Sequence, residues 1–295
     1  MVGVFVLPLA GELLRYSKQE LAYESTSIIS NGSRLTSQWF EAHSRHLDIM
    51  GVSVDSVEPA TLFQLGRWPA GGRPPRAGEG PADIGQLGHV RRAAALCREH
   101  GVLFKLNTVV TALNMHEDLS PLVNETGAMR WKIFQVLPMG GENTGAAATR
   151  GHDVAPLLVT AAQFGEYVAR ARAGVSDPSI IEEEDNATMQ ASYILVDEFG
   201  RLLDTSTGTK TPTAASVLHA GGVEAAAREL LASAGRGFHP EAYVRRGAHF
   251  PERWSRSRKP VEAPAGSGPA GGPPPAAAPR TPFHDAAAAP AASTA

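Results

Sequence analysis

The stretch between positions 104 and 145 constrains the fold most, because two short apolar runs in it carry charged and amide side chains. The runs are FKLNTVV and RWKIFQVLPM, and both have the length and composition of strands. Alternate residues of a strand share a face, so Lys105 lies with Asn107, and Arg130 with Lys132. Cations on one side of a buried strand need an anion, and phosphate is the usual one. The alternative is an exposed sheet face with solvated charges.

Strand-like and helix-like segments alternate along most of the chain. Strands are predicted over 25–30, 47–54, 102–110 and 131–139. Helices are predicted over 36–46, 84–100, 119–125, 161–173 and 222–234, and a hairpin over 192–203 that turns at Phe199–Gly200. Regular alternation of this kind predicts an α/β fold, with parallel strands inside, helices outside and ligands at the carboxyl ends of the strands.

Composition divides the chain of 295 residues into a folded part, residues 1–256, and a tail, residues 257–295. From Pro260 onward the tail is dominated by Ala, Pro and Gly. Such a segment buries too little apolar surface to offset its ordering entropy, so we expect it to be disordered. A second low-complexity stretch, RWPAGGRPPRAGEGP at about 67–81, is predicted to be a loop insertion.

Charge and hydropathy argue against several classes of partner. The net charge of −3 argues against nonspecific binding of nucleic acid. No apolar run approaches the about 20 residues of a membrane span, and the opening MVGVFVLPLAGELL lacks the basic region of a signal peptide. The single cysteine, Cys97, excludes an intramolecular disulfide framework and agrees with a reducing compartment. We therefore expect a cytoplasmic protein.

Other polar residues fall at predicted strand ends or in turns. Asn31 and Ser53 end two strands and could hold ribose hydroxyls or an amine, although Ser-Asn-Gly is also ordinary turn chemistry. The loop GGENTG would let its backbone approach a ligand, and Glu142 and Asn143 lie there, although a tight turn explains the glycines equally well. The four acids Glu182–Asp185 have no partner motif, so we expect a solvated loop.

Six segments, taken together in their order, resemble one family. The segments are SIISNGS, RHLDIMGVSVDS, FKLNTVV, RWKIFQVLPMGGENTG, SYILVDEFGRLLD and YVRRG. They resemble viperin-type proteins, which are radical S-adenosylmethionine (SAM) enzymes that dehydrate nucleotides, and the resemblance extends from about Leu7 to Trp254. It implies a partial (βα)6 radical-SAM barrel that lacks its first βα units. It also implies dehydration of CTP or a similar nucleoside triphosphate to a 3′-deoxy-3′,4′-didehydro nucleotide, in antiviral defence.

The resemblance implies roles for individual residues. The nucleoside triphosphate would be bound by Lys105, Asn107, Arg130, Lys132, Lys210 and Arg246. SAM would be contacted by Asn31, Ser53, Arg67, Glu142 and Asn143, with Arg67 on the SAM carboxylate. Tyr193 would donate a proton to the leaving hydroxyl, since a phenol of pKa about 10 keeps its proton at neutral pH. Without the resemblance, Tyr193 is equally well explained as a core aromatic, and Lys210 and Arg246 are typical of solvated loops.

The sequence lacks the cysteines that bind the iron–sulfur cofactor of the family. Radical SAM enzymes hold a 4Fe–4S cluster with the cysteines of a CxxxCxxC loop, because thiolates are the ligands that such clusters require. The one cysteine here, Cys97, lies in RRAAALCREHGV, where we expect a buried residue on a helix. The GGEP segment of the family is absent too. We therefore expect an N-terminally shortened member that is inactive as written. The alternatives are a cluster-free nucleotide-binding protein and a noncatalytic interaction protein or fragment.

Overall fold

Five parallel strands form the central sheet of the computed structural model, which describes residues 7–68, 85–144, 153–189 and 193–232. The strands pair in chain order, and every pairing between them is parallel. Their bounds are β1 (Ser27–Ser30), β2 (Ile49–Ser53), β3 (Leu103–Val110), β4 (Arg130–Gln135) and β5 (Ile181–Glu184). The carboxyl ends of the strands therefore lie along one edge, which is where ligands bind in open α/β sheets.

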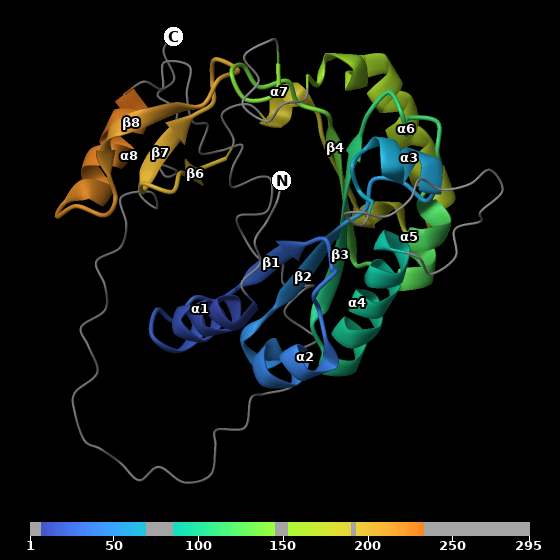
Figure 1. Cartoon of the computed structure of the whole chain (residues 1–295), viewed down its shortest axis with the longest axis horizontal. Helices are drawn as coiled ribbons and strands as arrows, with labels where there is room; N and C mark the ends of the chain where they lie inside the picture. Colours follow the sequence, from blue (N-terminus) through green and yellow to red (C-terminus); the bar gives the residue numbers. More distant parts are fainter. Residues whose placement is uncertain (1–6, 69–84, 145–152, 190–192, 233–295) are drawn as a thin grey trace, which may run out of the picture.

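Helices connect these strands, and Figure 1 shows α4, α5 and α6 along the same side of the sheet. The α-helices of this part are α1 (Leu7–Gln19), α2 (Ser37–His43), α3 (Pro59–Gln64), α4 (Gln86–His100), α5 (Ser120–Thr126), α6 (Ala161–Gly174) and α7 (Asn186–Met189). Short 3₁₀ segments are η1 (Ser44–His46), η2 (Ala155–Leu157) and η3 (Pro178–Ile180). One face of the sheet is thus covered by helices.

The helix ends follow from groups that satisfy free backbone amides and carbonyls. Thr36 accepts a hydrogen bond from the backbone amide of Trp39 at the start of α2. Thr160 and Gln163 form a capping box at the start of α6. Helix α4 ends at Gly101, whose φ of 67° lies in the left-handed region that favours glycine. The predicted end of this helix at residue 100 is confirmed.

Alternation of side chains gives the sheet an apolar face and a polar face. The fully buried side chains of the apolar face pack into the main core and include Met50, Val52, Leu106, Trp131 and Ile133. The indole Nε1 of Trp131 donates a hydrogen bond to Thr108 Oγ1 at 2.9 Å, so the polar atom of the buried ring is satisfied. The opposite face carries the charged residues of β3 and β4, together with Glu182 and Glu184 of β5.

A second, antiparallel sheet follows in the chain and appears at the upper left of Figure 1. Its strands are β6 (Leu195–Val196), β7 (Arg201–Asp204) and β8 (Thr211–Ser216), and helix α8 (Gly222–Ala232) packs against it. A small core of Leu202, Ala226 and Leu230 holds this unit together. A backbone bridge between Gly140 and Thr209 joins it to the loop after β4.

The parallel α/β arrangement predicted from the alternation is confirmed, and the predicted hairpin turns at Gly200, with φ of 73°. The loop predicted at Glu182–Asp185 is wrong, because residues 181–184 form β5 and pair with β4. Strand β8 was not predicted, and the strand expected over 131–139 ends at Gln135. Most of the predicted insertion and the whole tail lie outside the described residues. Among the described helices, none combines the length and apolar character needed to cross a membrane.

Phe40 provides a test of the main core. Its side chain is 0% exposed, whereas Leu13 on α1 is 57% exposed. Phe40→Ala should lower the free energy of unfolding by about 3–5 kcal/mol, the cost of deleting a buried aromatic ring. Leu13→Ala should change it by less than about 0.5 kcal/mol. Denaturant unfolding followed by circular dichroism measures both variants, and an equally small effect in both would contradict the packing of α2 into this core.

Candidate functional site

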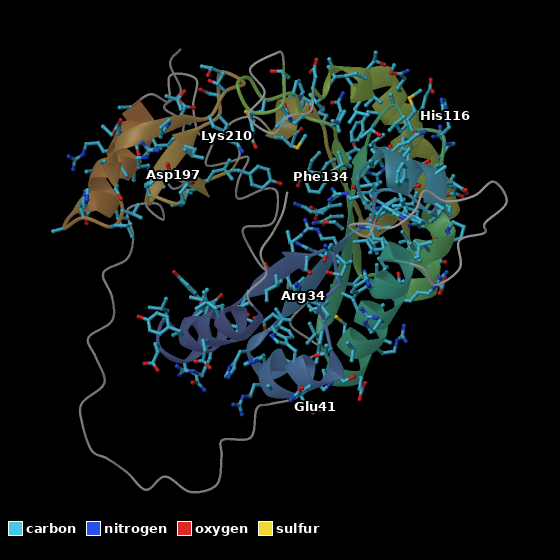
Figure 2. The ribbon with its side chains drawn as sticks, viewed as in Figure 1. Arg34, Glu41, His116, Phe134, Asp197 and Lys210 are labelled. Carbon is cyan, nitrogen blue, oxygen red and sulfur yellow. The ribbon has the colours of Figure 1, made fainter. Side chains whose placement is uncertain are left out.

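The polar face of the sheet gathers the residues that the sequence predicted to bind phosphate. Strand register aligns Lys105 with Arg130, and Asn107 with Lys132. Residues aligned in parallel strands point to the same side of the sheet. These four residues are called the cationic face below. The next residue on this face of β4 is Phe134, which Figure 2 shows on the side of the sheet away from helices α4–α6. The predicted grouping of these side chains is therefore present in the structure.

Two carboxylates of β5 face the cations. Arg130 forms an ion pair with Glu182, and Lys132 forms one with Glu184. The side chains of Arg130, Lys132 and Glu184 are 8%, 12% and 2% exposed, while Glu182 is 33% exposed. Removing one partner of a buried ion pair costs about 3–5 kcal/mol, because the remaining charge is uncompensated. The expectation of solvated acids is therefore corrected: Glu182 and Glu184 are structural partners of the cationic face.

Lys105 differs from its two cationic neighbours. Within the described part of the chain, no carboxylate lies at ion-pair distance from its ammonium group. The side chain lies over the bare backbone of Gly51, where a Cβ atom would be 2.7 Å from Lys105 Cε. Burial lowers the pKa of Lys105 to about 8, and the positive charges of Lys132 and Arg130 act in the same direction. An anion bound here would relieve this repulsion.

Asn107 has an unsatisfied polar atom on the same face. The residue is 7% exposed, and its Oδ1 accepts no hydrogen bond from any described residue. A buried polar atom left without a partner costs about 1–3 kcal/mol, so a ligand or a water is expected to satisfy it. Ser53 on β2 is aligned with Asn107 and is half-buried, which places its hydroxyl group on the same face. The site therefore combines cations with neutral polar groups.

Tyr193 joins the cationic face through Glu184. The phenol hydroxyl donates a hydrogen bond to Glu184 Oε2 at 2.5 Å. Glu184 thus contacts Tyr193 and Lys132 at the same time. The structure brings the predicted proton donor next to a predicted phosphate-binding lysine, although the two residues lie far apart in the sequence.

Asn31 and Arg67, predicted to contact SAM, lie near the carboxyl ends of β1 and β2. Both make contacts within the chain: Asn31 Oδ1 accepts a hydrogen bond from the backbone amide of Ser33 at 3.0 Å, and Arg67 Nε pairs with Asp55 Oδ2 at 2.7 Å. Asn31 therefore forms a local turn, the alternative that the sequence left open. Both residues also line a pocket of about 170 Å³ together with Ser33, Gly66, Trp68, Gly85, Gln86 and His89.

The remaining predicted residues lie in loops. Asn143 Oδ1 accepts a hydrogen bond from the Met139 amide at 2.7 Å, so this side chain closes its own loop. Glu142 pairs with Lys210 at 2.5 Å, which ties the loop after β4 to the antiparallel sheet. Figure 2 shows Lys210 on that second unit. Lys210 is therefore not one of the residues aligned along the parallel strands. Arg246 lies outside the described residues.

Sequence reasoning missed Gly51, Glu182 and Glu184. The signal for the two acids was their spacing, since positions 182 and 184 share one face of a strand in the same way as 130 and 132. For Gly51 the signal was weaker. A glycine inside a strand indicates that another group approaches the backbone closely, but the sequence does not say which group that is. Here the neighbour is the Lys105 side chain.

Cys97 does not fit the role of a cluster ligand. It is fully buried in α4, and burial raises the pKa of its thiol to about 12. Iron–sulfur clusters are held by thiolates, whereas this thiol keeps its proton. Among the described residues, no group of three or more His, Cys, Asp and Glu side chains is arranged to hold a metal ion. The residues that the structure describes therefore do not fit a 4Fe–4S cluster.

Known proteins similar to this chain are dehydratases of nucleotides. Over 247 residues, the chain is 32% identical to the S-adenosylmethionine-dependent nucleotide dehydratase RSAD2 of Oncorhynchus mykiss, covering 84% of this chain and 63% of the relative. The chain is a homologue of the S-adenosylmethionine-dependent nucleotide dehydratases. The protein of the same name from Danio rerio is 32% identical over 252 residues, covering 85% of this chain and 62% of the relative. The viperin-type resemblance predicted from the sequence is confirmed.

These relatives are longer than the part of them that the chain matches. A dehydratase from Flammeovirga pacifica is 31% identical over 201 residues, covering 68% of this chain and 61% of the relative. The chain thus spans somewhat over three fifths of the length of these relatives. No protein-family model matches it. The structure of native anSMEcpe with bound AdoMet is 13% identical and covers 67% of this chain and 56% of that one, with a TM-score of 0.42. This likeness is too low to support an inference.

The pKa of Lys105 predicts how stability depends on pH. This pKa is about 8 in the folded chain, against an ordinary value of 10.5. Between these values the unfolded chain binds more protons, so the contribution of Lys105 to stability rises with pH. Lys105→Met removes the buried charge. We expect the variant to be more stable than wild type at about pH 7, by a margin that shrinks toward about pH 10. Denaturant unfolding across this range measures the margin.

The matched control is Lys210→Met, which alters a lysine that is more exposed and pairs with Glu142. Its difference from wild type is measured over the same range of pH and is the baseline for the Lys105 variant. A difference in the Lys105 variant that does not change across this range would contradict the lowered pKa.

Proposed function

We propose that this chain binds a nucleoside triphosphate on the cationic face and is the substrate-binding part of a SAM-dependent nucleotide dehydratase. The observation that carries the proposal is the alignment of Lys105, Asn107, Arg130 and Lys132 on one face, where the Lys105 ammonium has no carboxylate partner among the described residues. Homologues with the name nucleotide dehydratase support the same substrate class. CTP or a similar triphosphate is the expected ligand.

The charges favour a phosphate chain over a less charged ligand. Lys105, Arg130 and Lys132 bring three positive charges, and Glu182 and Glu184 bring two negative ones. The site therefore has a net positive charge, and Glu182 and Glu184 hold Arg130 and Lys132 in place before a triphosphate binds. Glu182 is 33% exposed and can turn toward water, so a phosphate could take its place on Arg130. Bidentate binding of phosphate is typical of arginine.

SAM, a partial barrel and the proton donor belong to the same proposal. SAM would lie near the carboxyl ends of β1 and β2, with Asn31, Ser53 and Arg67 around it and Glu142 and Asn143 in the loop after β4. Arg67 would have to share its guanidinium with Asp55. The open sheet β1–β5 would be part of a (βα)6 barrel. Tyr193 would supply the proton to the leaving hydroxyl, and for this its hydroxyl would have to turn from Glu184, the carboxylate to which it donates in this structure.

A second candidate function is nucleotide binding without radical chemistry. The buried, protonated Cys97 favours it, because the described residues offer no other thiol for a 4Fe–4S cluster. The sequence as a whole contains no second cysteine. The two candidates share the triphosphate site and differ only in whether the chain can hold a cluster. One experiment therefore tests the triphosphate site, and a second experiment tests the cluster.

The first experiment tests the triphosphate site. Lys132→Ala should weaken binding by about 1.5–3 kcal/mol, the range for hydrogen bonds to charged groups. Lys105→Met should act in the same direction and leaves no carboxylate unpaired. Isothermal titration with CTP, ATP, GTP and UTP measures the affinity. The control is Arg172→Ala, which breaks an exposed pair with Glu183 on the opposite face of β5 and should change nothing. Equal affinity in all four proteins would mean that the cations serve the fold alone.

The second experiment tests the cluster. We expect that anaerobic reconstitution of this chain yields no stoichiometric 4Fe–4S cluster, because one thiol cannot supply the ligands. Iron and sulfide analysis with absorption spectroscopy measures it. A stoichiometric cluster that survives Cys97→Ser would refute the argument from thiolates, and a cluster lost in that variant would show that Cys97 is a ligand after all.

A further inference from the structure

Glu184 is a buried carboxylate beside the cationic face, and none of the roles inferred from the sequence includes it. Its side chain is 2% exposed, it forms an ion pair with Lys132, and it accepts the hydrogen bond of the Tyr193 hydroxyl at 2.5 Å. We infer that Glu184 is a positioning residue, which holds the ammonium group of Lys132 and the phenol of Tyr193 in fixed places on the nucleotide site. This inference rests on the proposed function, because Lys132 and Tyr193 are its proposed triphosphate ligand and proton donor.

The neighbouring acid gives the comparison that makes the inference specific. Glu182 lies on the same strand and the same face, but it is 33% exposed and pairs with Arg130. The partial exposure of Glu182 leaves it room to turn toward water, so it is not fixed beside Arg130. Glu184 is 2% exposed and contacts Lys132 and Tyr193 at the same time, so it is held in one place and holds both groups.

Glu184 also decides where the phenol hydrogen points. In the structure the Tyr193 hydroxyl donates to Glu184 Oε2, so the lone pairs of the phenol oxygen are directed elsewhere. A carboxylate acceptor makes this hydrogen bond stronger than a bond to a neutral group. The Glu184 side chain is restricted in position, because it is buried and its backbone belongs to β5, which pairs with β4. Loss of the carboxylate would therefore release two groups of the site together.

The test uses the variants Glu184→Gln and Glu182→Gln, which keep shape and remove one charge each. Isothermal titration with CTP measures affinity. Glu184→Gln should bind CTP about tenfold more weakly, the lower end of the range for losing a hydrogen bond to a charged group. Glu182→Gln should bind it equally well or more tightly, since a competitor for Arg130 is gone. Tighter binding in Glu184→Gln would overturn the inference, because Glu184 would then be only a competing counter-ion.

A spectroscopic measurement separates positioning from general damage. Tyrosine labelled with ¹³C at Cζ gives one signal per ring, and the Tyr193 signal is the one missing in Tyr193→Phe. We expect it to move in Glu184→Gln and to stay in Glu182→Gln. Should Glu184→Gln fail to fold, Lys132→Met tests the link from its other end, and the Tyr193 signal should move there as well. An unmoved signal in whichever of these two variants folds would overturn the inference.

Failure of the inference differs from failure of the proposed function. If wild-type protein binds none of CTP, ATP, GTP and UTP, the proposed function fails and the inference falls with it. If wild type binds CTP and Glu184→Gln binds it with the same affinity, the triphosphate site stands and only the role of Glu184 is refuted.

Discussion

The pairing of buried charges across β4 and β5 is the constraint on which the rest of this structure depends. Arg130 and Lys132 are nearly buried, and removing the partner of a buried cation costs about 3–5 kcal/mol. Strand β5 supplies the carboxylates, and it can do so only in the register that sets Lys132 beside Glu182 and Phe134 beside Glu184. The two ion pairs therefore favour this position of β5 in the sheet, in addition to its hydrogen bonds to β4.

The same constraint separates the two faces of the sheet. Met50, Val52, Leu106 and Ile133 alternate with the polar positions and pack into the main core. A slip of one residue in any strand would exchange the two faces and bury the cations in that core. The apolar core therefore secures the register, and the register brings together charges that lie far apart in the sequence.

The sequence was sufficient to predict the first four strands of the central sheet, their parallel arrangement, and the faces that Lys105 shares with Asn107 and Arg130 with Lys132, because period-two alternation is a local property. It was not sufficient for β5. Four residues, IEEE, look like a solvated acidic turn until the cations on the neighbouring strand are placed beside them. The predicted SAM-binding residues also have contacts that the sequence did not predict. Asn31, Arg67 and Asn143 lie in loops, where side chains bond to local backbone or to nearby acids that a pattern does not reveal.

The energetics of the cationic face argue that its purpose is binding. Buried ion pairs contribute little to stability, and apolar residues of similar volume often stabilise a fold more. Lys105 goes further, since burial and two positive neighbours lower its pKa to about 8 and its ammonium has no carboxylate partner in the described part of the chain. Gly51 leaves room for this side chain, where any larger residue would meet it. Under the proposed function, a bound anion would relieve the repulsion around Lys105, and the free energy that this charge costs the empty fold would then contribute to holding a phosphate chain.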